Sequence, residues 1–262
     1  MNQMVQVTRL GAVAVIRFSN PPQHLIDNKG ALQLGDAMRA ALDDAAVRAI
    51  VLAGDDDGVF IRHADVAQIA RAGDALAEGR ITPEAFLDAP FPRLGQMLDS
   101  ARKPVIAAIN GICMGGGLEI ALACTMRIAG RAVDRVGLPE IRIHIFPGSG
   151  GTQRLARLIG WQRARLFALR GEIVDAGAAH ALGLVDELAD DPLDRAIEVA
   201  EALAARPAAA VAAVLELTQS RDLAPGLERE LRAFAELLRD EPQVRARLAR
   251  FVRDEERLDT ID

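Results

Sequence analysis

Two acidic residues in this 262-residue chain stand close to glycine-rich segments at which helices are predicted to begin. Glu119 comes two positions after the run Gly115–Gly117, in the segment "NGICMGGGLEIALAC". Glu140 leads into a second glycine-rich helix start at 148–151, in "GLPEIRIHIFPGSGGTQRLARLIG". A glycine turn at a helix start presents free backbone N–H groups and the positive end of the helix dipole, which stabilise negative charge on a ligand oxygen. Two carboxylates beside such a site predict general acid and base chemistry on a carbonyl compound.

The environment of Glu119 has two interpretations. Its surroundings, "LEIALAC", are apolar on nearly every side, which predicts a helix that is buried all round. A buried carboxylate without a full set of partners has a raised pKa, and such a group suits proton transfer. The alternative is a capping carboxylate that accepts hydrogen bonds from N–H groups of the first helical turn and has no chemical role.

The glycine run also has an alternative interpretation, as a phosphate-binding loop. A dinucleotide fingerprint has the spacing G-x-G-x-x-G, whereas the glycines of 115–117 are consecutive and Ile120 stands where the last glycine belongs. The sequence has no Walker pattern either. The pattern therefore favours an oxyanion hole over a phosphate cradle.

The composition excludes several classes of function. A formal net charge of −6 and a pI near 5.4 argue against nucleic acid or an anionic membrane as the main partner, and 3% aromatic residues argue against a base-stacking surface. No apolar run approaches the roughly 20 residues of a membrane span. The segment "MNQMVQVTRL" has no signal-peptide core, so a cytoplasmic location is predicted. Cys113 and Cys124 have no histidine at a zinc-finger spacing, so they are expected to be buried small hydrophobic residues and no metal site is predicted.

The elements that must position these residues alternate between strands and helices. Valine- and isoleucine-rich runs predict strands, and helical spacing of apolar residues or a Thr-Pro cap predicts helices. Repeated strand-then-helix units imply an α/β architecture over residues 1–190. Residues 191–262 are rich in alanine, leucine and charge without a strand signal, which predicts a helical C-terminal subdomain. The predicted strands are 11–19, 48–54, 58–61, 103–110, 125–130 and 131–137, and the predicted helices include 29–46, 83–101 and one that opens in the glycine run.

The run "KPVIAAINGICMGGGLEIALAC", followed by "GLPEIRIHIFPGSGGTQRLARLIG" and "GLVDE", resembles the enoyl-CoA hydratase/isomerase (crotonase) superfamily. The order of elements agrees from about residue 5 to residue 190, and the helical tail is similar to the trimerisation region of that family. The resemblance implies stacked ββα units that form a spiral core, with a C-terminal helical subdomain. It also implies a homotrimer or a dimer of trimers.

The resemblance further implies the site and its reaction, the syn addition of water across the double bond of a 2-enoyl-CoA thioester. The backbone N–H groups of Gly116 and of Ala64, the residue before Asp65 in "FIRHAD", would form the oxyanion hole for the thioester carbonyl. Glu119 would hold and deprotonate the water, and Glu140 would deliver a proton to the α carbon. Coenzyme A is then part of the substrate, and no separate cofactor is implied.

Two positions depart from the family pattern. Arg62 and His63 replace the usual Ala-Gly of the oxyanion loop, and His144 stands where a small residue is common. Arg62 is expected to meet solvent or a CoA phosphate, since guanidinium suits phosphate binding. For His63 and His144 the alternative is a loop side chain turned to solvent. At the site, His63 would narrow the acyl pocket, contact the thioester or support different chemistry.

These departures leave other functions open. One is an isomerase, or a hydrolase of a carbon–carbon bond or thioester that uses His63. Another is a non-catalytic acyl-CoA-binding protein, against which the pair of acids speaks. The resemblance places Leu25 near the adenine and adds Gly115 and Asp65 to the substrate-binding set, while the segment 66–100 is expected to supply pocket walls.

Overall fold

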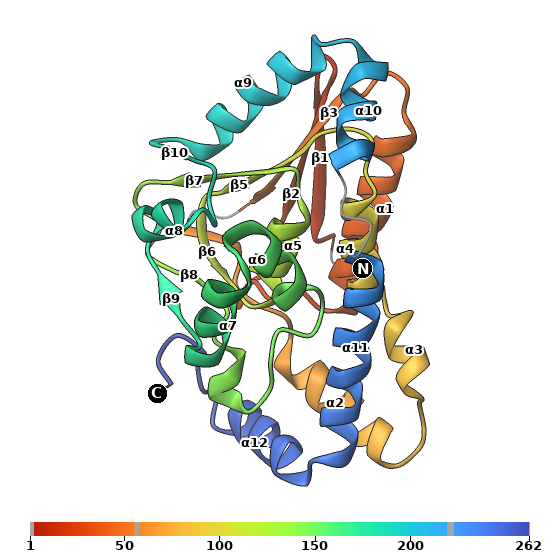
Figure 1. Cartoon of the computed structure of the whole chain (residues 1–262), viewed down its shortest axis with the longest axis vertical. Helices are drawn as coiled ribbons and strands as arrows, with labels where there is room; N and C mark the ends of the chain where they lie inside the picture. Colours follow the sequence, from red (N-terminus) through yellow and green to blue (C-terminus); the bar gives the residue numbers. More distant parts are fainter. Residues whose placement is uncertain (1–2, 56–57, 219–222, 262) are drawn as a thin grey trace.

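The computed structural model describes residues 3–55, 58–218 and 223–261, which form two β-sheets enclosed by helices (Figure 1). The larger sheet has the order β1-β2-β3-β5-β7-β10 and is parallel except for the antiparallel edge pair β1–β2. Its strands are β1 (Val5–Leu10), β2 (Val13–Phe18), β3 (Ala49–Gly54), β5 (Val105–Ile109), β7 (Met126–Gly130) and β10 (Glu187–Ala189). The smaller sheet has the order β4 (Gly58–Ile61), β6 (Gly111–Met114), β8 (Val136–Gly137) and β9 (Ile173–Val174).

From β3 to β8, successive strands of the chain alternate between the two sheets, and this alternation builds the site. β3 is followed by β4 and α2 (Val66–Ala77), and β5 by β6 and α5 (Gly116–Ala123). β7 is followed by β8, the 3₁₀ helix η1 (Glu140–Ile143) and α6 (Gly151–Ile159). The predicted α/β class with stacked ββα units and a helical C-terminal part is therefore confirmed. Each unit brings the start of its helical segment to the same end of the smaller sheet.

The central strands of the larger sheet are buried on both faces, as their continuous apolar runs predict. In β3, Ile50 and Leu52 belong to the core between the sheets, whereas Val51 belongs to the core on the opposite face. That opposite face is covered by α9 (Pro192–Ala204), which presents alanines at 196, 200 and 204 (Figure 1). One small residue per helical turn lets this helix lie close to the strands.

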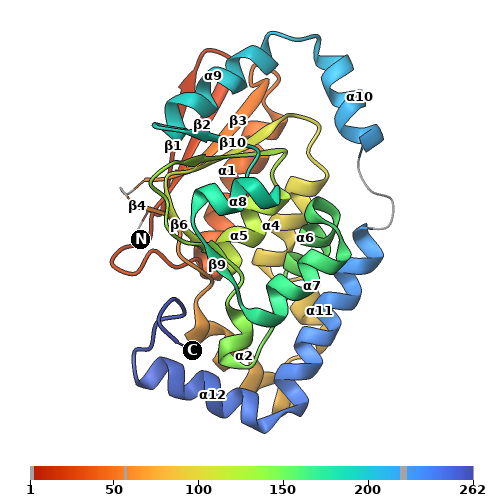
Figure 2. The ribbon, with the colours of Figure 1, turned by 60° about the vertical axis from the view of Figure 1, so that its left-hand side comes forward.

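The C-terminal helices go to two different ends of the molecule (Figure 2). α9 packs on the larger sheet, whereas α11 (Leu223–Asp240) and α12 (Pro242–Arg253) pack against α2 beside the smaller sheet. Between them, α10 (Ala208–Thr218) has no buried residue. The predicted division into 1–190 and 191–262 stays a prediction, and residues 219–222 and 262 of the second range lie outside the described part.

Several predicted elements were wrong in their bounds. The helix predicted over 83–101 is broken into α3 (Pro83–Leu87) and α4 (Pro90–Asp99), because the residue before a proline is disfavoured in the helical region. The segment before the glycine run forms the strand β6, and of the strand predicted over 131–137 only β8 exists. The polar N-terminal segment, for which no strand was predicted, forms the edge strand β1. Only its Val5 is buried, so the strand is held by backbone hydrogen bonds and has no alternating apolar pattern in its sequence.

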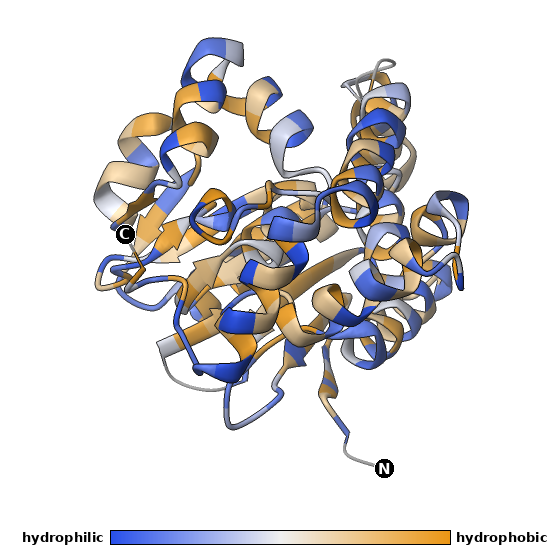
Figure 3. Ribbon diagram, turned by 90° about the horizontal axis from the view of Figure 1, so that it is seen from below, coloured by the Kyte–Doolittle hydropathy of each residue, from blue (hydrophilic) through white to orange (hydrophobic). Residues whose placement is uncertain are grey.

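The remaining helices complete the cover of the two sheets, with apolar strands at the centre and polar outer helix faces (Figure 3). These helices are α1 (Asn28–Asp43), α7 (Trp161–Arg170) and α8 (Ala176–Leu182). Cys113 and Cys124 are buried free thiols, as predicted, and burial raises the pKa of both. Within the described ranges, no helix has the length and apolar character that a membrane crossing requires.

Candidate active site

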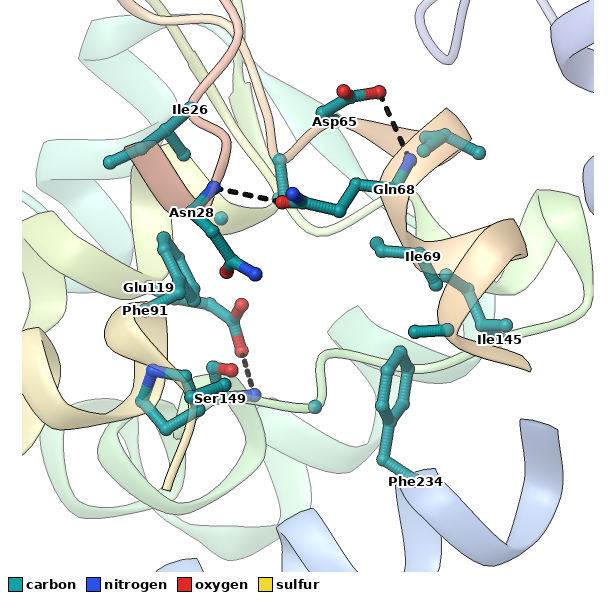
Figure 4. Close-up of a pocket in the computed structure, with 18 of the residues that line it drawn as sticks. Ile26, Asn28, Asp65, Gln68, Ile69, Phe91, Glu119, Ile145, Ser149 and Phe234 are labelled. Carbon is teal, nitrogen blue, oxygen red and sulfur yellow. Dashed lines mark hydrogen bonds between the residues drawn. The ribbon is translucent and has the colours of Figure 1, made fainter. Parts of the chain in front are cut away.

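A cavity of about 450 Å³ lies where α2, α5, η1 and α11 meet (Figure 4). Glu119 and Asn28 lie on one wall, and Ile69, Ile145 and Phe234 lie on the opposite wall. Apart from a few polar groups the lining is apolar, and two aromatic contacts build its far wall: Phe234 packs on Phe86 and on Phe146, with ring centroids 5.8 and 5.5 Å apart. The lining also includes residues Val66, Ala72, Ile81, Ala85, Ala89, Phe91 and Ile143. Such a cavity suits an apolar ligand with a polar end.

The backbone N–H groups of Ala64 and Gly116 lie side by side at this cavity. Ile26 N donates to His63 O (3.0 Å) and Asp65 N donates to Ile26 O (2.9 Å), so this extended strand pairs through the residues on either side of Ala64. Because alternate amides of an extended chain point in opposite directions, the Ala64 N–H faces away from that pairing. Neither this N–H nor that of Gly116 donates a hydrogen bond within the described part of the chain.

The absence of a side chain at Gly116 allows this close approach. A Cβ atom there would lie 3.0 Å from Ala64 Cβ, 3.0 Å from Phe91 Cζ and 3.1 Å from Ala64 N. Gly116 is the first residue of α5, so its N–H is one of the free N–H groups at a helix N-terminus, where the dipole is positive. The preceding Gly115 has φ +48°, a conformation that favours glycine. Two such donors can hold an oxygen that gains negative charge.

Glu119 is buried (4% exposed) in a helix whose residues are all buried, as the sequence predicted. Its Oε1 accepts a hydrogen bond from Ser149 N (2.7 Å; Figure 4) and a second from Gly151 N (2.9 Å), at the start of α6. Burial raises the pKa of this carboxyl, while those two N–H groups and the Arg154 guanidinium oppose the rise. The residue lines the cavity, and it does not cap its own helix as the alternative interpretation predicted. The N–H groups come from α6, not from its own helix.

Glu140 is the first residue of η1 and is also buried (7% exposed). Its Oε1 lies 3.1 Å from the position that a Cβ atom would take at Gly115, and its buried Oε2 has no hydrogen-bond partner in the described part of the chain. Burial raises its pKa well above the usual range, and the negative charges of Glu119 and Glu230 raise it further. The two carboxyls at the cavity thus differ: Glu119 accepts two N–H hydrogen bonds that favour its charged form, whereas the negative charge of Glu119 favours the protonated form of Glu140.

Three further predicted substrate-binding residues, His63, Gly115 and Asp65, line the cavity. The His63 ring is buried, donates from Nδ1 to Ala64 O (2.8 Å) and meets Phe251 edge to face. Burial lowers its pKa, so the ring is held neutral. Asp65 caps α2 by accepting hydrogen bonds from Ala67 N and Gln68 N.

The other predicted residues do not line the cavity. Arg62 is half-buried and donates from Nε to Gln23 O (3.1 Å). Leu25 is half-buried, and the lining begins with its neighbour Ile26. His144 is exposed, with a left-handed backbone at the end of η1.

Sequence reasoning missed several residues of the site. Asn28, whose N–H donates to Gln68 Oε1 (2.8 Å), lines the cavity beside Glu119 (Figure 4). Phe234 and the buried Glu230 come from α11, about a hundred residues after the motifs. A signal for Glu230 existed in the sequence, because it interrupts the apolar stripe of an amphipathic helix. The described residues hold no group of three His, Cys, Asp or Glu side chains arranged to bind a metal.

Comparison with known proteins gives a consistent set of relatives. The family model for enoyl-CoA hydratase/isomerase matches residues 8–253. The chain is 38% identical over 197 residues to the putative enoyl-CoA hydratase/isomerase YngF of Bacillus subtilis, covering 73% of each chain. It is 34% identical over 240 residues to the 2,3-dehydroadipyl-CoA hydratase of Escherichia coli, covering 89% of each.

Two other comparisons extend this set. The chain is 35% identical over 209 residues to the peroxisomal bifunctional enzyme of Homo sapiens, a match that covers 78% of this chain but 27% of that protein. The structure is similar to that of a putative enoyl-CoA hydratase from Streptomyces avermitilis, with a TM-score of 0.84 at 27% identity, covering 97% of this chain and 92% of the other.

Proposed function

The chain belongs to the enoyl-CoA hydratase/isomerase (crotonase) family, and we propose that within it this protein is a hydratase that adds water syn across the double bond of a 2-enoyl-CoA thioester. The product is a 3-hydroxyacyl-CoA. The observation that carries the proposal is a pair of buried carboxyls, Glu119 and Glu140, beside the two N–H groups of Ala64 and Gly116. The family implies an acyl-CoA thioester as substrate, and coenzyme A enters as part of it.

In the proposed reaction the thioester oxygen accepts hydrogen bonds from Ala64 N–H and Gly116 N–H. These donors stabilise the enolate, whose negative charge develops only along the reaction path. The acyl chain lies against the apolar wall that includes Phe234 and Ile145.

The two carboxyls divide the proton transfers between them. Glu119, ionised and held by Ser149 N and Gly151 N, takes a proton from the water whose oxygen bonds to the β carbon. Glu140, kept protonated by burial and by the charge of Glu119, gives its proton to the α carbon. The hydroxyl group and the hydrogen of water are thereby added across the double bond. Glu119 ends the step protonated and Glu140 ends it ionised, and the proton returns to Glu140 before the next turnover. Pairs of carboxyls with separated pKa values perform such acid and base roles in other enzymes.

The alternative chemistries have less support. A hydrolase that uses histidine would be favoured if His63 and His144 both faced the cavity and Glu119 pointed away from it. Instead, His144 is exposed, Glu119 lines the cavity, and His63 is held neutral by burial with Nδ1 bonded to Ala64 O. A non-catalytic binder gives no reason for two buried acids, because burying a charge without partners is costly.

The proposal is tested by incubating the protein with crotonyl-CoA and following the loss of absorbance of the conjugated thioester. We expect turnover, with 3-hydroxybutyryl-CoA as the product by mass. If crotonyl-CoA and longer 2-enoyl-CoA esters stay unchanged while 3-enoyl-CoA esters are converted to 2-enoyl-CoA, the protein is an isomerase.

We also propose that the protein assembles as a homotrimer or a dimer of trimers. Support comes from the resemblance and from large apolar side chains that are exposed in the single chain: Trp161 and Leu169 on α7 are each 63% exposed, and Leu217 on α10 is 82% exposed. Contact with another chain in such an assembly would cover these side chains. Light scattering over a dilution series should give three or six times the mass of one chain, and a mass that stays at one chain contradicts the assembly.

A further inference from the structure

The start of α6 is held by two carboxylates, only one of which the proposed reaction uses. Glu119 Oε1 accepts from Ser149 N and Gly151 N. Glu230 Oε1 accepts from Gly150 N, and its Oε2 accepts from Thr152 N (2.9 Å). Four consecutive backbone N–H groups therefore point alternately to one carboxylate and to the other.

Glu230 is an unusual residue for its place in the fold. It lies on the buried face of α11, between Leu227 and Phe234, and is 5% exposed. Its Oε2 also accepts from the Thr152 hydroxyl and from Gln153 N (3.3 Å), so its carboxylate is saturated with donors. Carboxylates are stabilised near a helix N-terminus, and this one caps α6 from another helix. The N-cap residue of α6, a glycine with φ +102°, supplies no side chain of its own.

The same backbone segment is fixed on its other side by Arg154. This side chain donates from Nη1 to Ser149 O (2.7 Å) and makes two hydrogen bonds to Asp99 of α4 (2.9 and 2.7 Å). Arg154 thus fixes the Ser149 carbonyl, and Glu230 fixes the two N–H groups that alternate with those reaching Glu119. If the Gly150 and Thr152 N–H groups lost their acceptor, the peptides could rotate, and the donors to Glu119 would turn with them.

We propose that Glu230 is a positioning residue, which holds segment 149–153 so that Ser149 N and Gly151 N fix the orientation of the Glu119 carboxylate in the cavity. This inference rests on the proposed hydration. Through Glu230, α11 also connects the two walls of the cavity: its Phe234 lies on one wall, and Glu230 binds the segment that holds Glu119 on the other. Glu230 does not itself line the cavity.

The negative charge of Glu230 adds a measurable signature. Burial, and next the charge of Glu119, raise the pKa of Glu230 to about 7. The charged groups that face it are Glu119 of α5, Glu140 of η1 and Arg154 of α6. Because the charge of Glu230 raises the pKa of Glu140, its removal should lower that pKa. The alkaline limb of the rate profile, where Glu140 loses its proton, should then move to lower pH.

The test compares Glu230→Gln with Glu236→Gln, a substitution of the same charge change at an exposed position of the same helix. We expect Glu230→Gln to lower kcat for 2-enoyl-CoA hydration about 10- to 100-fold, since small misplacements of catalytic groups cost this much. KM should stay near the wild-type value, and the alkaline limb should shift as described. Glu236→Gln should match the wild type in all three. Wild-type kcat and an unmoved limb in a folded Glu230→Gln protein overturn the inference.

Two further measurements separate this inference from its premise and from misfolding. Amide hydrogen exchange of 149–153 should accelerate in Glu230→Gln and not in Glu236→Gln, a readout that needs no turnover. If the wild type hydrates no enoyl-CoA, the proposed function fails while this exchange result still decides the role of Glu230. Should Glu230→Gln not fold, Thr152→Val removes one donor to the carboxylate and should lower kcat, while Thr152→Ser retains the hydroxyl and should not. Equal kcat in these two variants contradicts the inference.

Discussion

Replacing Glu119 by glutamine should lower kcat for crotonyl-CoA hydration by about 10²- to 10⁴-fold, the range that positioned acid–base groups contribute. The amide keeps the shape of the side chain and can still accept from Ser149 N or Gly151 N through its oxygen. It cannot take a proton from water, so the step that forms the bond to the β carbon loses its base. Initial rates from the thioester absorbance measure the effect.

The control for this substitution separates chemistry from binding. The affinity for butyryl-CoA, which has no double bond to hydrate, should change little, because the Ala64 and Gly116 donors and the apolar wall remain. Glu201→Gln, at an exposed position of α9, should leave both rate and affinity unchanged. Hydration by Glu119→Gln at a rate near that of the wild type would remove Glu119 from the mechanism.

Glu140→Gln should reduce hydration by a similar factor, about 10²- to 10⁴-fold, because the α carbon then has no proton donor. Unlike the first substitution, it should also stabilise the protein at alkaline pH. The folded-state pKa of Glu140 is raised, so the stability it contributes is complete below its unfolded-state pKa and is lost as pH rises through the folded-state value. Glutamine does not ionise, and it removes the buried charge that Oε2 carries without a partner.

Thermal unfolding across alkaline pH, combined with the rate assay, measures both halves of this prediction. The expected result is a lower kcat together with a Tm at or above that of the wild type. If Glu140→Gln still hydrates crotonyl-CoA at the wild-type rate, the second acid is not used, and single-acid chemistry such as isomerisation becomes the better account.

Local patterns in the sequence were enough for much of this description. The strands around β3 and β5, the helix α5 that is buried all round, and the raised pKa of Glu119 follow from apolar runs and from the placement of one carboxyl among them. The family was identified from the glycine run and the segment that follows it, and the family comparison confirmed it. These features are local, because hydrophobic burial and helix starts depend on residues within one or two turns.

Only the tertiary structure decided which distant groups meet these motifs. Glu119 accepts from N–H groups some 30 residues away, and Glu230 accepts from Gly150 across a separation of 80 residues. His63 and His144 both depart from the family pattern, yet one lies in the cavity lining and the other is exposed. A one-dimensional pattern records which residues are apolar or able to bond, but the partner of a buried polar group depends on how helices from separate segments pack. The sequence therefore determined the family and the chemistry-bearing residues, and the packing of α6 and α11 decided how Glu119 is held.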